Sequence, residues 1–195
     1  MMKLYSDLSR QAPSPRRVRM FLAEKSFDLQ IVEMELHKDN RTTEFRLKNP
    51  MGNLPVLELD DGTCISESVA ICRYIEQLQP EPSLFGNKSL DIALIEMWNR
   101  RAEFAFYMPI EFAGGFLGAE VAEGAIKRVQ KTMRLFNDKL SVSKYLAGEW
   151  FSIADITAKV ALDFGMRFNG IVIPDEVEHF VRWNQALETR ESTKV

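Results

Sequence analysis

The sequence predicts an α/β domain followed by an all-α domain, and three observations support this. Residues 1–78 alternate short apolar strands with amphipathic helices, in the order strand, helix, strand, helix, strand, strand, helix. A proline-rich break, Gln79-Pro80-Glu81-Pro82-Ser83, follows. Beyond this break the strong apolar patterns all have helical spacing. We therefore expect domains at residues 1–79 and 90–195, joined by a linker at 80–89.

The first strand is expected at Lys3–Ser6 and the first helix between Ser14 and Lys25. Serine followed by proline is typical of a helix start, because serine is a good N-cap and proline lacks the N–H that position N1 leaves unbonded. Ser14 is therefore the predicted N-cap. The helix is expected to end at Ser26, where a residue other than glycine would carry a strained C-cap.

The second strand is expected over Asp28–Leu36. Its apolar alternation shifts phase at Ile31-Val32, which suggests burial on both faces or a bulge. Strand, helix and strand of this size imply a parallel βαβ unit. A short helix is then expected to end before Asn49-Pro50.

A β-hairpin is the clearest local feature of the chain. Val56–Leu59 and Thr63–Ile65 flank Asp61-Gly62, which predicts a two-residue turn with positive φ at both residues. Pro55 stands at the first position of the hairpin, where a residue without an N–H is tolerated. A helix follows Ser66, and its apolar positions have the spacing of one buried face: Ile71, Tyr74, Ile75 and Leu78.

The C-terminal domain is expected to contain a long helix over 90–113, kinked at Pro109, and a second helix over 121–140. The pattern Ser152–Asp155 predicts a capping box, with serine at the N-cap and aspartate at N3 of the next helix. A last helix is expected from about Asp175 to Glu188.

Composition limits the class of protein. The net charge of −3 and the pI near 5.6 offer no basic field for nucleic acid. No apolar run approaches the ~20 residues that a membrane span needs, and no signal peptide is evident, so we expect a cytoplasmic protein. Cys64 and Cys72 lack the spacing of a metal site, so we expect two buried thiols and no metal.

Two motifs together resemble the soluble glutathione S-transferases, and the resemblance extends over nearly the whole chain. The first is Leu54-Pro55, the hairpin and Glu67-Ser68, and the second is the box at Ser152–Asp155. The bacterial members with a serine-type site are the most similar branch. The resemblance implies a thioredoxin-like N-terminal domain, a helical C-terminal domain and a homodimer.

The resemblance also implies glutathione as cosubstrate. In this family the proline that corresponds to Pro55 is cis, and the residue before it, here Leu54, pairs its backbone with the cysteinyl part of glutathione. The Glu67-Ser68 pair would hold the γ-glutamyl end: Glu67 its amino group, and the hydroxyl and local N–H groups its carboxylate.

Two asparagines and one aromatic segment complete the expected site. Asn40 lies where the family often has a ligand for the glycine carboxylate, and Asn53 is a second candidate, although a polar loop is the alternative meaning of each. The helical domain should supply the electrophile pocket, for which we expect Tyr107 and Met108. Core packing is the alternative for that segment.

A hydroxyl at the start of the first helix is the expected partner of the glutathione thiol. A thiol titrates near ~8.5, and lowering this pKa to about 6.5 takes ~2.7 kcal/mol of preferential stabilisation of the thiolate. A hydroxyl donor and helix N–H groups are sufficient in principle, and Ser14 supplies both. Ser9 in the preceding loop and Tyr5 in the first strand remain alternatives.

The expected reaction is attack of the glutathione thiolate on a small hydrophobic electrophile. Glutathione-dependent peroxide reduction at the same site is a second enzymatic hypothesis, and a non-catalytic binding module with the transferase fold is a third. The presence of both Glu67-Ser68 and Leu54-Pro55 favours the enzymatic hypotheses, since a module that does not bind glutathione has no need of them.

Overall fold

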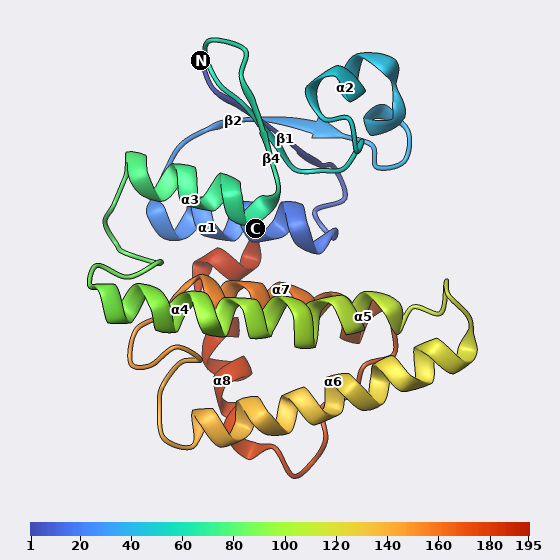
Figure 1. Ribbon diagram of the computed structural model, residues 1–195, viewed down its shortest axis with the longest axis vertical. Coiled ribbons are helices and arrows are strands. Elements are labelled where there is room, and N and C mark those ends of the chain that lie inside the picture. Colours follow the sequence, from blue (N-terminus) through green and yellow to red (C-terminus); the bar gives the residue numbers. More distant parts are fainter. The chain divides into compact units, whose positions relative to one another are not determined.

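The computed structural model describes all 195 residues, which form two compact units: unit 1, Met1–Pro82 with Val195, and unit 2, Ser83–Lys194. Unit 1 combines a sheet with helices, and unit 2 is built from helices (Figure 1). The predicted fold class is confirmed.

Unit 1 has the predicted order of strands and helices. Its elements are β1 Lys3–Asp7, α1 Pro13–Lys25, β2 Gln30–Met34, η1 Asp39–Arg41, α2 Thr43–Lys48, β3 Val56–Glu58, β4 Cys64–Ser66 and α3 Ser68–Leu78. The sheet order is β2-β1-β3-β4, in which β1 and β2 are parallel and the other two pairs are antiparallel. This is the thioredoxin-like arrangement.

Helices cover both faces of the sheet. Successive side chains of β1 point to opposite faces, so the contacts of Ser6 and Tyr5 show which helix lies on each face. Ser6 accepts a hydrogen bond from Nε of Arg19 in α1 at 2.9 Å, so this face of β1 meets α1. α3 lies beside α1 (Figure 1). The ring of Tyr5 packs edge-on against Phe45 of α2, with centroids 5.9 Å apart, so the other face meets α2.

β2 differs from its prediction. It lies at the edge of the sheet, and Ile31 is 37% exposed. Its register with β1 is unbroken from Gln30 to Met34. The expectation of burial on both faces or a bulge is therefore wrong, since the loss of alternation reflects the solvent exposure of an edge strand.

The hairpin of β3 and β4 is confirmed, but its turn type is not. The N–H of Leu59 donates to the Thr63 carbonyl at 2.8 Å, and the N–H of Gly62 donates to the Leu59 carbonyl at 3.0 Å. The loop therefore has three residues, Asp60–Gly62, and only Gly62 among them has a positive φ, 86°. A type I turn that closes with glycine in the left-handed region confines the unusual backbone conformation to the residue that tolerates it.

α1 begins earlier than predicted. Its N-cap is Ala12, which makes no side-chain cap, and Pro13 stands near N1, so Ser14 lies within the first turn and the N-cap prediction is wrong. Proline is as favourable at position 13 as at 15, and the side chain of Asp7 accepts the Ala12 N–H at 3.1 Å. The aspartate thus fixes the backbone of the N-cap residue, whose own side chain makes no cap.

α1 ends as predicted, with Ser26 in the left-handed conformation at φ 49°. The Lys25 side chain before it is buried and forms an ion pair with Glu76 at 2.5 Å. Its ammonium also donates to three carbonyls of the proline-rich break, those of Gln79, Pro80 and Pro82. These bonds hold the segment after α3 against α1.

Unit 2 is helical throughout. Its elements are α4 Ser89–Arg101, η2 Ala102–Tyr107, α5 Met108–Phe112, α6 Ala119–Leu140, α7 Ile153–Phe168, α8 Glu178–Glu188 and η3 Glu191–Lys194. α7 is buried along most of its length and contacts α4, η2 and α5. It is the central helix of the unit.

The long helix expected at 90–113 is divided by the π-helical turn η2, next to the predicted kink at Pro109. A proline at this position removes the N–H that an α-helix would pair with the carbonyl of Ala105. The Thr132 hydroxyl, from α6, lies 2.7 Å from that carbonyl and donates to it. The hydroxyl thus satisfies the carbonyl and joins α6 to η2.

The predicted capping box is present at the start of α7. The carboxylate of Asp155 is fully buried and accepts bonds from the Ser152 N–H and hydroxyl, from the Leu146 N–H and from the indole N–H of Trp183, at 2.9–3.1 Å. Burial acts to raise the pKa of Asp155, and these donors oppose the shift. One side chain therefore connects α7, the loop before it and α8.

We predict that Asp155→Ala lowers the free energy of unfolding by about 3–5 kcal/mol, because it leaves several buried donors without an acceptor. Chemical denaturation followed by circular dichroism measures this. Asp138→Ala, which removes an exposed carboxylate from α6, is the control and should change stability by less than about 0.5 kcal/mol. Equal losses in the two variants would contradict the role assigned to Asp155.

Candidate active site

A hydrogen bond joins the second turn of α1 to the first residue of α3. Nη1 of Arg17 donates to Oγ of Ser68 at 2.9 Å. Arg17 is 1% exposed and Ser68 is 4% exposed, so the contact is buried. Since the Ser68 oxygen accepts this bond, its own hydroxyl hydrogen is directed elsewhere and can serve a ligand.

Leu54 presents backbone groups that the fold does not use. The Leu54–Pro55 peptide bond is cis, as the resemblance implies. No hydrogen bond joins the Leu54 N–H or carbonyl to the rest of the chain, because the pairing of β3 begins only at Val56. The Leu54 side chain is buried against Phe45 and Val56, which fixes the position of this backbone.

Glu67 has an unusual backbone conformation. It is the residue before α3, with φ 69° and ψ 113°, and its carbonyl accepts the first helical bond, from Ile71 at 3.0 Å. A positive φ at a residue other than glycine costs about 1–3 kcal/mol and is concentrated at functional sites. The Glu67 side chain is exposed, and its carboxylate has no ion pair or hydrogen bond within the chain.

The three candidate thiol partners have different surroundings. Ser14 is half-buried in the first turn of α1, where it supplies the only N–H among the first three residues because Pro13 and Pro15 have none. The Ser9 hydroxyl donates to the Asp7 carboxylate at 2.6 Å. The Tyr5 hydroxyl donates to the Glu58 carboxylate at 2.5 Å, and burial together with this bond raises the pKa of Tyr5.

The two asparagines also differ. Asn40 is 1% exposed, its side-chain oxygen accepts the His37 N–H at 2.6 Å, and its amide group donates to the Gly52 carbonyl at 2.6 Å. Asn53 is exposed, and only its backbone carbonyl is used, as acceptor for the side chain of Asn49 at 2.8 Å. Asn40 therefore supports the loop before Leu54, whereas the Asn53 side chain faces solvent.

Neither cysteine has the surroundings of a nucleophile. Burial raises the pKa of the Cys72 thiol far above its ordinary value. Burial and the nearby Glu58 carboxylate raise the pKa of Cys64 as well. Both residues are free thiols in their protonated, unreactive form at neutral pH.

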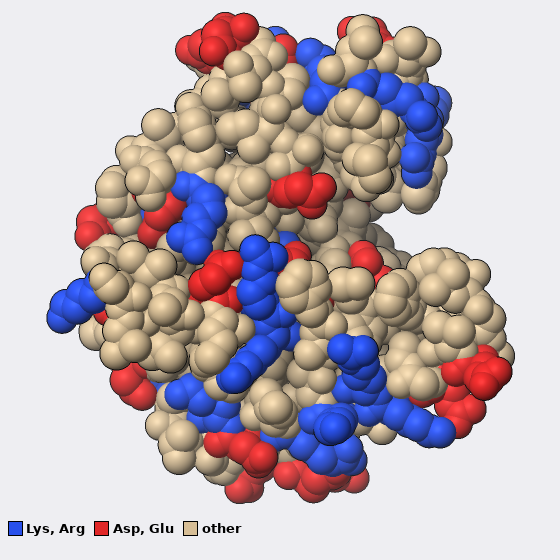
Figure 2. Space-filling view, in the orientation of Figure 1, with Lys and Arg blue, Asp and Glu red and all other residues tan.

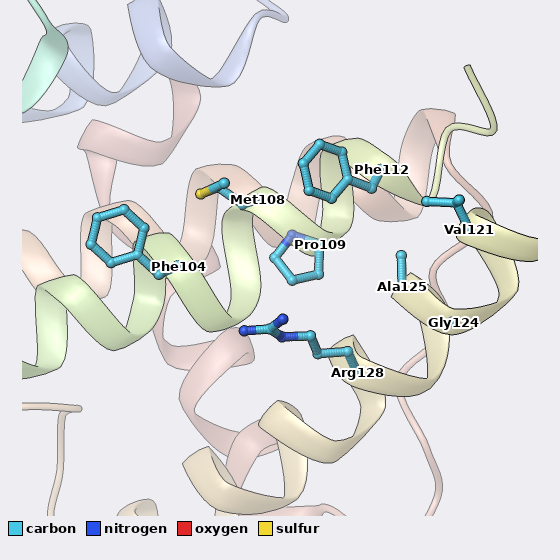
Figure 3. Close-up of a pocket in the computed structure, with 8 residues that line it drawn as sticks. All are labelled: Phe104, Met108, Pro109, Phe112, Val121, Gly124, Ala125 and Arg128. Carbon is cyan, nitrogen blue, oxygen red and sulfur yellow. The ribbon is translucent and has the colours of Figure 1, made fainter. Parts of the chain in front are cut away.

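The residues expected to contact an electrophile lie in unit 2. Tyr107, at the end of η2, is 7% exposed, and Met108, at the start of α5, is 38% exposed. Met108 lines a pocket of unit 2 together with Phe104 and Phe112 (Figure 3). Of the expected pair, only Met108 offers substantial exposed surface.

Comparison with known protein families agrees with this fold. Residues 12–78 match the family model described as "Glutathione S-transferase, N-terminal domain", and residues 91–191 match "Glutathione S-transferase, C-terminal domain". The chain belongs to the glutathione S-transferase family. Its relatives indicate that it is a glutathione transferase.

Individual relatives support the assignment. The chain is 37% identical to "Glutathione S-transferase 2" of Saccharomyces cerevisiae, over 93% of this chain and 84% of that protein. The crystal structure of a glutathione S-transferase domain-containing protein of Marinobacter aquaeolei has a TM-score of 0.90 at 35% identity, covering 97% of this chain and 98% of that one. The chain is also 32% identical, over 68% of its length, to a probable elongation factor 1-gamma of Arabidopsis thaliana, but it spans only 33% of that protein.

None of the helices is both long and apolar enough to cross a membrane.

Two features of the site were missed in the sequence. Arg17 was not predicted, although it lies one helical turn before Phe21 on the buried side of α1, where a basic residue needs a polar partner. The backbone conformation of Glu67 has no sequence signal, because glutamate is not a residue that favours positive φ. The motif of a hairpin followed by Glu-Ser and a helix predicts where the segment lies in the chain, but not its backbone conformation.

Asp7 organises the loop that leads to Ser14, and we predict that this makes the fold sensitive to acid. Burial acts to raise the pKa of Asp7, but bonds from the Ser9 hydroxyl and from the N–H groups of Ala12, Ser9 and Gln11 outweigh it and hold the pKa below its ordinary value. Such a carboxylate contributes stability above its unfolded-state pKa of about 3.9, which is lost as the pH falls through the lowered pKa.

Asp7→Asn should therefore lower the free energy of unfolding at pH 7 by about 1–3 kcal/mol. The variant should also lose less stability than the wild type between about pH 4 and pH 2. Urea denaturation across this range measures both effects. Parallel pH curves for the two proteins would show that Asp7 is not held in its charged form by the loop.

Proposed function

We propose that the protein joins glutathione to small hydrophobic electrophiles, and that Glu67, Ser68 and Leu54 of unit 1 bind the tripeptide. The observation that carries the proposal is the pairing of an exposed, unpartnered Glu67 carboxylate with the neighbouring Ser68, which a buried arginine holds at 2.9 Å. The Glu67 carboxylate is complementary to the amino group of the γ-glutamyl end. The Ser68 hydroxyl, supported by the positive charge of Arg17, is complementary to its carboxylate.

The unused backbone of Leu54 supports binding of the middle of the tripeptide. A free N–H and carbonyl on one residue can pair with an extended peptide as a short antiparallel strand does. Pro55 ends this pairing edge, because it has no N–H. We assign the exposed Asn53 side chain to the glycine end, and Asn40 to holding the Gly52 backbone in place.

Ser14 is the proposed partner of the thiol. Its hydroxyl and N–H lie in the first turn of α1, where the helix dipole also favours a negative charge. The Ser9 and Tyr5 hydroxyls donate to the carboxylates of Asp7 and Glu58, and neither residue lies in the first turn of a helix. Glutathione supplies the nucleophilic sulfur, and the protein binds it, orients it and stabilises its thiolate.

The electrophile and the assembly complete the proposal. We assign Met108 and the neighbouring Tyr107 to the contact with the hydrophobic electrophile. A cytoplasmic homodimer is proposed from the resemblance to the family. The dimer is supported by exposed apolar residues on one stripe of α4, spaced i, i+4 and i+7: Leu90, Leu94 and Met97, with 68%, 36% and 36% exposure.

A binding module is the second candidate, and the similarity to elongation factor 1-gamma favours it. Conjugation assays with an aryl halide and reduction assays with an organic hydroperoxide distinguish a transferase, a peroxidase and a module. A module would have neither activity.

We predict that Glu67→Ala weakens binding of glutathione by about 10–100-fold, the loss expected for one charge-assisted hydrogen bond. Retention on immobilised glutathione and isothermal titration calorimetry measure this. The fold should be unaffected, because the backbone conformation at φ 69° costs alanine and glutamate about the same free energy.

Glu44→Ala is the matched control, since it removes an exposed glutamate from the first turn of another helix, α2. This variant should bind glutathione as the wild type does. Wild-type affinity in Glu67→Ala, or an equal loss in both variants, would remove the assignment of Glu67.

We predict that Ser14→Ala raises the pKa of the bound thiol toward its ordinary value of about 8.5. The acid limb of the pH–rate profile should move to higher pH by about 1–2 units, because a smaller fraction of the thiol is ionised at a given pH. Ser9→Ala is the control and should leave the profile unchanged. A shift in Ser9→Ala or Tyr5→Phe, with none in Ser14→Ala, would transfer the role.

A further inference from the structure

Three polar side chains meet at the base of the segment that carries Leu54: Tyr5 of β1, Lys48 at the end of α2 and Glu58 of β3. The Tyr5 hydroxyl donates to Oε2 of Glu58 at 2.5 Å, and Nζ of Lys48 donates to the same oxygen at 2.9 Å. Nζ of Lys48 also lies 5.4 Å from the centroid of the Tyr5 ring. These three residues, which we name the Tyr5 cluster, therefore join two strands of the sheet to α2.

The ion pair of the Tyr5 cluster closes the loop that contains Leu54, because Lys48 precedes Leu54 in the sequence and Glu58 follows it. Fixing both ends of a loop reduces the conformations that the residues between them can adopt. The two charged side chains are 25% and 21% exposed, so solvent screens this pair less than a fully exposed one. Bonds from Tyr5 and Lys48 hold the pKa of Glu58 below its ordinary value, so Glu58 is charged at neutral pH.

α2 depends on the Tyr5 cluster for its place on the sheet. The helix has six residues, Thr43–Lys48, and a helix this short is not stable through its own hydrogen bonds alone. Phe45 is its buried residue, and the Tyr5 ring packs edge-on against Phe45. Tyr5 therefore contacts the apolar residue of α2 directly and reaches the last residue of α2 through Glu58.

Asn49 transmits the position of Lys48 to Leu54. The side-chain amide of Asn49 donates to the Asn53 carbonyl at 2.8 Å, and its backbone carbonyl accepts the Gly52 N–H at 2.8 Å. The turn between α2 and Leu54 is therefore bonded to itself through the residue that follows Lys48. A displacement of the end of α2 moves this turn, and Leu54 with it.

We propose that Tyr5, Lys48 and Glu58 are positioning residues for glutathione: they hold α2 and the turn after it where the Leu54 backbone meets the tripeptide. None of the three contacts the tripeptide. This role rests on the proposed function, and it gives Tyr5 a part in binding in place of a part in thiol activation. Loss of the cluster should weaken the binding of glutathione and leave the ionisation of its thiol unchanged, because the first turn of α1 is untouched.

Variants of two members of the cluster test the role by calorimetric titration with glutathione. Tyr5→Phe keeps the ring and removes the hydroxyl, and it should weaken binding about three-fold, whereas Lys48→Met should weaken it about ten-fold. The double variant should lose less than the product of these factors, because both side chains act through Glu58. Lys48→Arg keeps a charged donor and should bind within about two-fold of the wild type.

Kinetics separate positioning from catalysis. In Tyr5→Phe and Lys48→Met the KM for glutathione should rise by the same factors, while kcat at saturating glutathione stays within about two-fold. The acid limb of the pH–rate profile should not move in either variant, because the thiol keeps its partner. A moved limb with an unchanged KM would contradict the positioning role.

Glu58→Gln distinguishes positioning from an effect of charge through space. Lysine and arginine side chains gather over α2 on the face seen in Figure 2, and α2 itself contributes Arg46 and Lys48. Glutathione has a net negative charge at neutral pH, so removal of a carboxylate near these cations would strengthen binding if the field alone mattered. Positioning predicts the opposite sign. The neutral amide holds Lys48 less strongly than the carboxylate does, and binding should weaken about three-fold or more.

Hydrogen exchange of the protein without glutathione tests the cluster apart from the proposed function. The Gly52 N–H should exchange about five-fold faster or more in Lys48→Met and in Glu58→Gln, because the turn that protects it opens more often. Amides in the middle of α1 should be unaffected. NMR of the ¹⁵N-labelled protein measures each amide separately.

Two variants outside the cluster are controls. Tyr74→Phe removes a hydroxyl from a half-buried tyrosine of α3. Lys127→Met breaks an exposed ion pair with Glu123 in unit 2, which has a length of 2.6 Å. Neither variant should change the exchange of Gly52 or the affinity for glutathione.

The possible failures have different meanings. Unchanged exchange of Gly52 in Lys48→Met and Glu58→Gln would show that the cluster does not hold the turn, and faster exchange with wild-type affinity would show that the turn does not position the binding edge. Either result, or tighter binding in Glu58→Gln, would overturn the positioning role and leave the proposed function intact. A wild-type protein that does not bind glutathione would remove the proposed function and this role together.

Discussion

The hydrogen bond between Arg17 and Ser68 is the contact on which the site in unit 1 depends. It joins the second turn of α1 to the start of α3, two helices that are far apart in the sequence, and it is buried at both ends. Burying a guanidinium costs free energy unless its N–H donors are received, and the Ser68 oxygen receives the donor at Nη1 of Arg17. Because the Ser68 oxygen is occupied as an acceptor, its hydroxyl is directed as a donor.

The remaining parts of the site, Glu67 and Leu54, leave their binding groups unpaired. The chain turns through a left-handed conformation at Glu67, which leaves the carboxylate in solvent and begins α3 immediately afterwards. Leu54 buries its side chain and leaves its backbone unpaired. In unit 2 the polar contacts have a structural role instead, since Asp155 and Thr132 satisfy buried donors and acceptors that the chain itself creates. Binding groups and stabilising groups are therefore different residues.

The fold was predictable from sequence because apolar periodicity, proline breaks and the Ser152–Asp155 box are local signals. Errors arose where tertiary context decides: β2 is an edge strand, the hairpin loop takes in Asp60, and Asp7 fixes the backbone of the N-cap residue of α1, which is Ala12 and not Ser14. The segments of the site followed from a family motif, but their geometry did not. Neither the approach of Arg17 to Ser68 nor the bond from Asn40 to the Gly52 carbonyl has a local pattern, because each joins parts of the chain that only the folded state brings together.

The most direct test of the account is the NMR signal of the Leu54 amide during titration with glutathione. Asn53-Leu54 is the only Asn-Leu pair in the chain, so ¹³C-labelled asparagine and ¹⁵N-labelled leucine isolate this one amide. The account predicts that the signal moves downfield and saturates as glutathione binds, because an N–H without a partner gains an acceptor. A protein saturated with glutathione, in which the Leu54 signal has not moved, would contradict it.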